Sequence, residues 1–244
     1  MNKIFLSPSR QSGNKYAAGN TNEKVQCEKI TTATAAALER CGFWVFNAAG
    51  MDSYAERVDI AMQEQVDLYV PVHTNASANH NVTGTRVFVR SFEDEPSYKY
   101  AKKIFPVVDA CCPGKTSRLK TYKTLWEFNA QDRPSVYIEC DFHDVKSIAE
   151  WIVNHTKDIG ESICEGICNA FGVPYVGPAP DLKVGDAVRL RAGAPNYAGT
   201  KTFASWVYRS KLYLRELKGE RAVISVYKTG AITGTCNVND LNKY

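Results

Sequence analysis

Residues 67–76 of the chain read DLYVPVHTNA, an apolar run that ends in polar side chains. A strand that is apolar almost throughout is typical of a sheet covered on both faces, because each face then meets a hydrophobic layer. Helices supply such layers in α/β domains. The run therefore predicts a buried strand of an α/β sheet. Its carboxyl end carries His73 and Asn75, at the edge where sheets of this kind bind ligands.

Elsewhere in residues 1–171, short apolar strands alternate with amphipathic helices. Thr21 or Asn22 can cap the first helix, and Gly42 can end it. Residues 111–131 show no regular period and predict irregular structure. The alternation predicts the fold class, which is α/β with a mostly parallel sheet flanked by helices. The expected strands are residues 3–6, 43–46, 67–72, 85–90 and 135–140, and the expected helices are 22–40, 54–65, 96–110, 147–155 and 156–171.

A change of composition marks a second domain. Residues 172–182, GVPYVGPAPDL, concentrate glycine and proline where the helical period stops, which is typical of a linker. Beyond them, short stretches with period-two alternation and glycine-containing turns predict a small all-β barrel. We therefore divide the chain into a domain at 1–173, a linker at 174–181 and a domain at 182–244.

The positive charge is concentrated in the C-terminal domain. Residues 181–244 contain 11 Lys and Arg against 5 Asp and Glu, a net charge of +6, whereas the rest of the chain has 19 against 21. A basic module of this kind predicts a polyanionic partner.

The sequence excludes a membrane-spanning protein and a protein with an N-terminal secretion signal. No stretch approaches the roughly 20 apolar residues that cross a bilayer, and residues 1–14 lack the features of a secretion signal. We expect a chain that is made in the cytoplasm without a signal peptide and does not insert into membranes. The eight cysteines have no zinc-finger spacing. We expect reduced thiols, with Cys164 and Cys168 on one helix face in the core.

Acidic and imidazole side chains occupy the predicted strand ends. Glu23 lies in the first turn of the helix after the first strand, and Glu139 lies near the end of the strand at 135–140. Together with His73 they can converge at one edge of a parallel sheet. A catalytic zinc takes about three protein ligands from His and carboxylate, with a nearby carboxylate as general base. Each residue also has a structural explanation: Glu23 favours a helix N-terminus, His73 a backbone hydrogen bond and Glu139 an arginine partner.

In their order, these segments resemble the zinc-dependent N-acetylmuramoyl-L-alanine amidases of the amidase-3 type, which cleave peptidoglycan. The resemblance covers about residues 3–171. It implies that Glu23 and His73 are zinc ligands, that Asn75 contacts the substrate, and that Glu139 is catalytic. The FHD tripeptide at 142–144 also appears in family members made as phage lysins. The matching segments are NEK at 22–24, ERVDIAMQEQVDLYVPVHTNA at 56–76, GTRVFV at 84–89 and RPSVYIECDFHD at 133–144.

One position departs from the family. The family's first histidine ligand follows the first strand in an Asp-Pro-Gly-His motif, and this chain has SPSR at 7–10. Arg10 cannot ligate zinc, because a guanidinium is a cation with donors only. Gln11 or Asn14 can supply a carbonyl oxygen, which is a weaker zinc ligand than imidazole, and we take Gln11 as the third ligand. His80, in the loop after 76, is a further candidate donor.

The C-terminal domain resembles a bacterial SH3-type wall-binding domain. The resemblance rests on KVGDAVRLRAGA at 183–194, on Trp206 and on GERAVIS at 219–225. Exposed aromatic rings can contact sugar rings or peptide stems, although each can also fill the core of a small barrel. We expect Trp206 to bind substrate, and peptidoglycan and anionic wall polymers to be the partners. A basic barrel with aromatic residues can also bind single-stranded nucleic acid, but the pairing with the first domain favours the wall. The aromatic candidates are Trp206, Tyr208, Tyr213 and Tyr227.

We therefore expect an endolysin-like peptidoglycan hydrolase, from a phage, a prophage or a bacterial autolysin, that uses zinc to cleave the amide between N-acetylmuramic acid and L-alanine. It would act at the cell wall, released or extracellular. The alternative is a non-catalytic wall-binding protein with a degenerate amidase domain, which Arg10 in the histidine's place motivates. Bound metal distinguishes the two.

Overall fold

The computed structural model describes residues 1–178 and 181–244 and separates into two compact units, Met1–Gly177 and Pro178–Tyr244. The predicted linker at 174–181 includes residues 179–180, which lie outside the described residues. Each unit encloses a hydrophobic core of its own.

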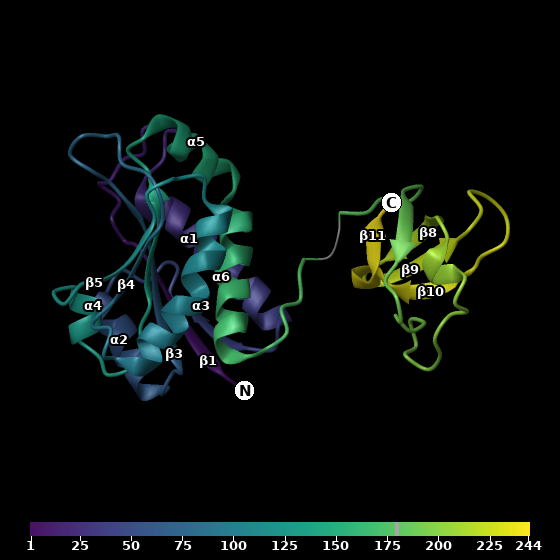
Figure 1. Ribbon diagram of the computed structural model, residues 1–244, viewed down its shortest axis with the longest axis horizontal. Helices are drawn as coiled ribbons and strands as arrows, with labels where there is room; N and C mark the ends of the chain where they lie inside the picture. Colours follow the sequence, from purple (N-terminus) through teal and green to yellow (C-terminus); the bar gives the residue numbers. More distant parts are fainter. Residues whose placement is uncertain (179–180) are drawn as a thin grey trace. The chain divides into compact units, whose positions relative to one another are not determined.

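The first unit is built on a six-stranded sheet with the strand order β2-β1-β3-β6-β4-β5 (Figure 1). Only the β4–β6 pair is antiparallel among its described pairings. The predicted α/β fold with a mostly parallel sheet is confirmed. The strands are β1 (Lys3–Pro8), β2 (Trp44–Asn47), β3 (Leu68–Asn75), β4 (Arg86–Val89), β5 (Arg118–Thr121) and β6 (Tyr137–Phe142).

Helices cover both faces of this sheet. Alternate residues of β3 point to opposite sides, because the side-chain period of a strand is two. Leu68, Val70 and Val72 face the main core under α1, α3 and α6, whereas Tyr69 faces a smaller cluster that includes residues of α2. The helices are α1 (Glu23–Arg40), α2 (Tyr54–Gln63), α3 (Glu95–Cys111), α4 (Trp126–Asn129), α5 (Lys146–Asn154) and α6 (Thr156–Phe171).

The start of α1 follows from its capping residue. The side chain of Asn22 accepts a hydrogen bond from the backbone N–H of Val25, which satisfies one of the free donors of the first turn. Glu23 is thereby held in the first turn, where it is buried. Val25, in the same turn, is 39% exposed and lies outside the core.

The stretch 111–131 is more regular than predicted. It contains β5, which is largely exposed at the edge of the sheet, and the short helix α4. An exposed edge strand needs no apolar run, and a helix of one turn shows no period. The expectation of irregular structure is therefore wrong for residues 118–121 and 126–129.

The second unit is an antiparallel sheet with the order β10-β9-β8-β7-β11. Its core includes Leu212 and Leu214 of β8 and Val188 and Leu190 of β7, so the outward side chains of these strands are the residues in between. Its resemblance to an SH3-type barrel stays a prediction. The elements are β7 (Ala187–Leu190), β8 (Leu212–Lys218), β9 (Arg221–Ser225), β10 (Gly234–Asn237), β11 (Leu241–Lys243) and the 3₁₀ helices η1 (Val207–Arg209) and η2 (Val238–Asp240).

Within the described chain, no helix has the length and apolar character needed to cross a bilayer. The eight cysteines are free thiols, and Cys164 and Cys168 are fully buried in the core of the first unit, as expected.

Candidate active site

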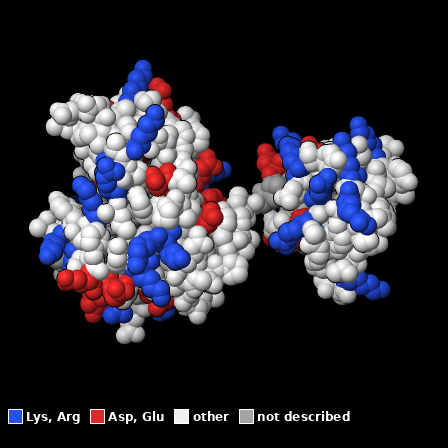
Figure 2. Space-filling model, viewed as in Figure 1, with Lys and Arg blue, Asp and Glu red and all other residues white. Residues whose placement is uncertain are grey.

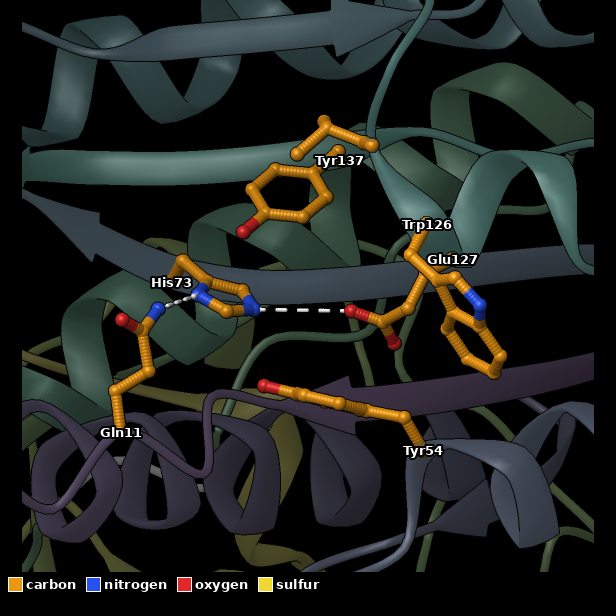
Figure 3. A pocket seen from close by; sticks show the side chains of 7 residues that line it. Gln11, Tyr54, His73, Trp126, Glu127 and Tyr137 are labelled. Carbon is orange, nitrogen blue, oxygen red and sulfur yellow. Dashed lines mark hydrogen bonds and ion pairs between the residues drawn. The ribbon is translucent and has the colours of Figure 1, made fainter.

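The candidate site lies on the α2 and α4 side of the sheet, at the carboxyl end of β3. His73 and Glu139 are Cα partners on the adjacent parallel strands β3 and β6, so their side chains point to the same face. Tyr137 precedes Glu139 by two residues on that face, and its ring stacks on His73 with centroids 4.6 Å apart. A hollow of about 220 Å³ opens here (Figure 3). It is lined by Gln11, Tyr54, His73, Leu125, Trp126, Glu127 and Tyr137.

Glu23 and His73 are in direct contact. Glu23 Oε1 lies 2.9 Å from His73 Nδ1, and the two residues are 1% and 3% exposed. Asn14 Nδ2 donates to the other carboxylate oxygen of Glu23 at 2.6 Å and to Gln11 Oε1 at 2.8 Å. The Gln11 amide in turn approaches His73 Nδ1 at 3.5 Å. These four side chains therefore form one polar cluster.

Opposing effects set the pKa values of this pair. Burial by itself raises the pKa of Glu23, but hydrogen bonds from His73 and Asn14 and the charge of His73 bring it below its usual value. Burial lowers the pKa of His73, but the Glu23 hydrogen bond and the surrounding carboxylates raise it above its usual value. Without a metal, their contact therefore favours the charged form of each partner relative to the same group in water.

Glu139 contributes an acid with one unpartnered oxygen atom to the site. Its Oε2 atom is buried and has no hydrogen-bond partner among the described residues. Burial, reinforced by the charge of Glu23 and opposed by that of His73, raises the pKa of Glu139 to about 8. A carboxyl group with a raised pKa can both take up and release a proton near neutral pH, which is what a general acid–base catalyst requires.

Glu127 is the functional candidate that the sequence did not reveal. It lies in α4, and its Oε2 atom is 3.9 Å from His73 Nε2, on the side of the ring opposite Gln11 (Figure 3). Its other oxygen accepts hydrogen bonds from Ser7 at 2.6 Å and Tyr69 at 2.7 Å, both on the same face of the sheet. Neither spacing nor period marks Glu127, because α4 has a single turn within a polar stretch.

A buried arginine links the elements around these side chains. Arg57 of α2 is 0% exposed, and its Nη1 atom donates to Ser7 Oγ at 3.1 Å and to the carbonyl of Pro8 at 2.6 Å. It thus connects α2 to the end of β1 and, through Ser7, to Glu127.

Arg10 and Gln11, the neighbours at the position of the family's first ligand, point in different directions. The side chain of Arg10 turns away to the carbonyl of Asp52 and packs over the Tyr54 ring at 5.0 Å. Gln11 instead lines the hollow beside His73. The tight turn after β1, in which Ser12 N donates to the Arg10 carbonyl, sends these neighbours in different directions.

Other predicted residues lie outside the hollow. The Asn75 side chain accepts from the backbone of Ala76 at 2.8 Å, and His80 is an exposed loop residue that contacts Asp144 at 3.0 Å. Trp206 belongs to the second unit, where it is 50% exposed. The structure therefore brings together Glu23, His73, Glu139 and Gln11, and it does not bring His80 to them.

The donors of this cluster suit a metal ion. The carboxylate of Glu23 and the amide of Gln11 both lie beside the imidazole of His73. A flip of the Gln11 amide exchanges its oxygen and nitrogen, so that either atom can face the cluster. His73 Nε2 and Glu139 Oε2 are both buried without hydrogen-bond partners among the described residues. A single carboxylate, imidazole and amide oxygen supply the three protein ligands that a catalytic zinc takes, although the amide is a weak one.

A second group of metal-ligating side chains lies elsewhere. Among the residues that the structure describes, Cys41, Cys164 and Cys168 have sulfur atoms within 4.8 Å of one another. Cys164 and Cys168 belong to the main core, on the face of the sheet opposite His73. These thiols therefore take no part in the hollow.

Comparison with known proteins identifies the fold of the first unit. The catalytic domain of CwlV, an N-acetylmuramoyl-L-alanine amidase from Bacillus (Paenibacillus) polymyxa var. colistinus, superposes with a TM-score of 0.64 at 15% identity, covering 71% of this chain and 100% of that one. An amidase of Nostoc punctiforme gives 0.63 at 18% identity, covering 70% and 97%. The catalytic domain of an endolysin targeting Clostridia difficile gives 0.55 at 22% identity, covering 68% and 96%.

Sequence comparison covers the same part of the chain. No curated protein matches it. The Amidase_3 family, described as N-acetylmuramoyl-L-alanine amidase, matches residues 4–169, which include Glu23, His73 and Glu139. Its members hydrolyse peptidoglycan. The chain therefore belongs to the N-acetylmuramoyl-L-alanine amidase family.

Proposed function

We propose that this chain is an active, zinc-dependent and endolysin-like amidase that cleaves the bond between N-acetylmuramic acid and L-alanine. One observation carries the proposal: Glu139, whose buried Oε2 atom has no hydrogen-bond partner among the described residues, lies in register with His73, whose ring contacts Glu23. This combination of an unused acid and a histidine–carboxylate pair is what metal-assisted amide hydrolysis needs.

Glu23, His73 and the amide oxygen of Gln11 would hold the zinc. Asn14 would orient Glu23 and Gln11, because its amide nitrogen donates a hydrogen bond to each. Bound there, zinc supplies Lewis acidity that polarises the scissile carbonyl and lowers the pKa of a water molecule. Glu139 takes the proton of the attacking water and returns it to the nitrogen of the leaving L-alanine. The burial of its Oε2 atom supports this role, because burial favours the protonated form from which Glu139 delivers the proton.

Glu127 acts as a positioning residue in this scheme. A metal-bound histidine usually donates its second ring N–H to a carboxylate, which fixes its tautomer and orientation. Glu127 Oε2 faces His73 Nε2 across 3.9 Å, and Ser7 and Tyr69 hold the opposite oxygen. Glu127 would thus fix the orientation of the His73 ring.

The aromatic walls of the hollow suit a sugar–peptide substrate. Tyr54, Trp126 and Tyr137 surround the His73 ring, and Trp126 is 51% exposed. Flat apolar rings can pack against sugar rings and the lactyl group. Asn75, at the end of β3, remains a proposed substrate contact farther along the strand.

The second unit would hold the enzyme on the wall, with Trp206 as a proposed contact and anionic wall polymers as partners. We place the site of action at the cell wall, because the substrate is found there.

The test is metal content together with amide cleavage. Purified wild-type protein should contain zinc and release amino groups of L-alanine from peptidoglycan. His73→Ala should lose both, whereas the matched control His80→Ala should keep both, because His80 is 69% exposed in a loop. Wild-type protein that stays free of metal in excess zinc and releases no amino groups would leave the non-catalytic wall-binding alternative that Arg10 motivates.

A further inference from the structure

The outward face of the second unit carries a row of cations and tyrosines across three neighbouring strands. Ala187 of β7 pairs with Tyr213 of β8, and Tyr244 continues the β11 pairing by donating its backbone N–H to the Ala187 carbonyl at 2.9 Å. Tyr244 and Tyr213 therefore flank Ala187 on adjacent strands. Because the alanine side chain is small, the space between the two tyrosines is left for a longer side chain.

Lysine and arginine side chains fill and extend this row. Lys211 Nζ lies 4.9 Å from the centre of the Tyr244 ring and 5.9 Å from that of Tyr213. Arg189 lies over Tyr244 at 5.0 Å on one side, and Lys228 lies over Tyr213 at 5.5 Å on the other. The order along the row is Arg189, Tyr244, Lys211, Tyr213 and Lys228, which we call the cation–tyrosine strip.

The cations of the strip keep their charge uncompensated. The ion pairs of the second unit within the described chain join Arg191 to Asp240, Arg221 to Glu216 and Lys243 to Asp186. Arg189, Lys211 and Lys228 take part in none of them. The tyrosine rings instead hold these side chains by cation–π contacts, which orient a cation without neutralising it. Asp186, which directly precedes β7, is paired with Lys243.

Each end of the strip borders a hollow. One, of about 330 Å³, is lined by Arg189, Asn242, Lys243 and Tyr244. The other, of about 270 Å³, includes Tyr213, Arg215, Lys228 and the exposed Val184. On the face of this unit that Figure 2 shows, Lys and Arg side chains predominate over acidic ones. Both hollows therefore combine an aromatic ring with positive charge.

We propose that the cation–tyrosine strip is the binding site of the second unit, and that its ligand is an anionic polymer of sugar or polyol units joined by phosphates. Three cations spaced by aromatic rings match a chain with repeating negative charges and intervening apolar ring or carbon faces. This proposal rests on the proposed function, because the polymer would be attached to the same cell wall whose peptidoglycan the first unit cleaves. It places binding on Tyr213 and Tyr244 in addition to Trp206.

The experiment uses the full-length protein and purified Gram-positive walls, either intact or stripped of their phosphate polymers. The strip variant is Lys211→Gln with Lys228→Gln, and the matched control, Lys201→Gln with Lys218→Gln, removes the same charge from exposed positions elsewhere on the unit. We expect the strip variant to bind intact walls about tenfold more weakly, equivalent to about 1.4 kcal/mol, and the control to bind within about twofold of wild type.

A second pair of variants tests the tyrosines. Tyr213→Phe keeps the ring that holds Lys211 and Lys228 and should bind as wild type does. Tyr213→Ala frees both lysines and should weaken binding about as much as the lysine variant. Thermal unfolding of each variant shows whether the unit is still folded, and Tyr213→Phe keeps the test decisive if Tyr213→Ala is not.

Each outcome decides the proposal. Equal binding by the strip and control variants would overturn it. Strip-dependent binding that persists on stripped walls would assign the strip to peptidoglycan itself, and competition by single-stranded DNA equal to that by free wall polymer would assign it to nucleic acid; both would overturn the stated ligand. Release of L-alanine amino groups from stripped walls, measured in parallel, tests the proposed function separately.

Discussion

The hollow at His73 and the cation–tyrosine strip both gather charged and aromatic side chains, but in opposite environments. Around the hollow, Glu23, His73 and Arg57 are buried, and most of their polar atoms have partners. In the strip, Arg189, Lys211 and Lys228 are exposed and have no ion-pair partners among the described residues. Buried charges interact strongly and depend on each neighbour, whereas exposed ones are weak singly and screened by salt. The first unit is therefore suited to catalysis, and the second is suited to binding that varies with the salt concentration.

The largest effect is expected for Glu139→Gln. The amide keeps the shape of the side chain but cannot accept the water's proton, so the hydrolysis rate should fall by about two to four orders of magnitude. Zinc content and fold should persist, as measured by metal analysis and thermal unfolding. Glu150→Gln, at an exposed position of α5, is the control. Loss of zinc in Glu139→Gln would make Glu139 a ligand, and full activity would refute the mechanism.

Next in size is Glu127→Gln. If Glu127 orients His73, neutralising it should weaken zinc binding by about 10- to 100-fold. Competition with a chelator of known affinity measures this without relying on activity. Ser7→Ala, which removes one hydrogen bond to Glu127, should give a smaller loss in the same direction. Unchanged zinc affinity in Glu127→Gln would show that the carboxylate only fills the wall of the hollow.

A pH effect on stability follows from Glu139, whose Oε2 atom is buried. In the metal-free protein, burial raises the pKa of Glu139 to about 8 from 4.5. The folded state therefore holds a proton that the unfolded chain releases, so the stabilisation is complete below pH 4.5 and is lost as the pH rises through 8. Each unit of pKa difference corresponds to about 1.4 kcal/mol.

Urea unfolding of metal-free protein at several pH values checks this dependence. Between about pH 5 and pH 8, wild type should lose about 1 to 3 kcal/mol more of its free energy of unfolding than Glu139→Gln, in which the group cannot ionise. Parallel curves for the two proteins would show that Glu139 ionises freely and is not desolvated.

The smallest expected effect is that of salt on wall binding. It also distinguishes the two regions most directly. Raising the ionic strength from about 0.05 M to about 0.5 M shortens the screening length and should weaken wall binding by the full-length protein. Zinc content should not change, because the charges around His73 are buried. Salt-insensitive wall binding would leave aromatic contacts as the main contribution and contradict the role given to the lysines.

The agreement between sequence and structure is best where a residue acts through its neighbours along the chain. The cap at Asn22 and the amphipathic helix α6 lie at their expected positions, and the apolar strand β3 begins one residue after its expected start and ends three residues beyond its expected end. Local hydrogen bonding and burial decide these elements, and both leave a period or a cap in the sequence. The agreement ends at β5 and α4, which are too exposed or too short to leave one.

For the site, family resemblance and strand ends were enough to select Glu23, His73 and Glu139, because parallel strands bring their carboxyl ends to one edge. Whether Arg10 or Gln11 enters the hollow depended on the turn after β1, and the position of Glu127 depended on contacts with Ser7 and Tyr69, which lie more than fifty residues away in the chain. In the second unit, the excess of positive charge was visible in the composition. The alignment of Lys211 between Tyr213 and Tyr244 arose only from the register of β7, β8 and β11. Composition and period therefore determined which kinds of side chain are available in each unit. The pairing of distant strands decided which of these side chains meet, because the burial of the whole sheet sets how its strands pair.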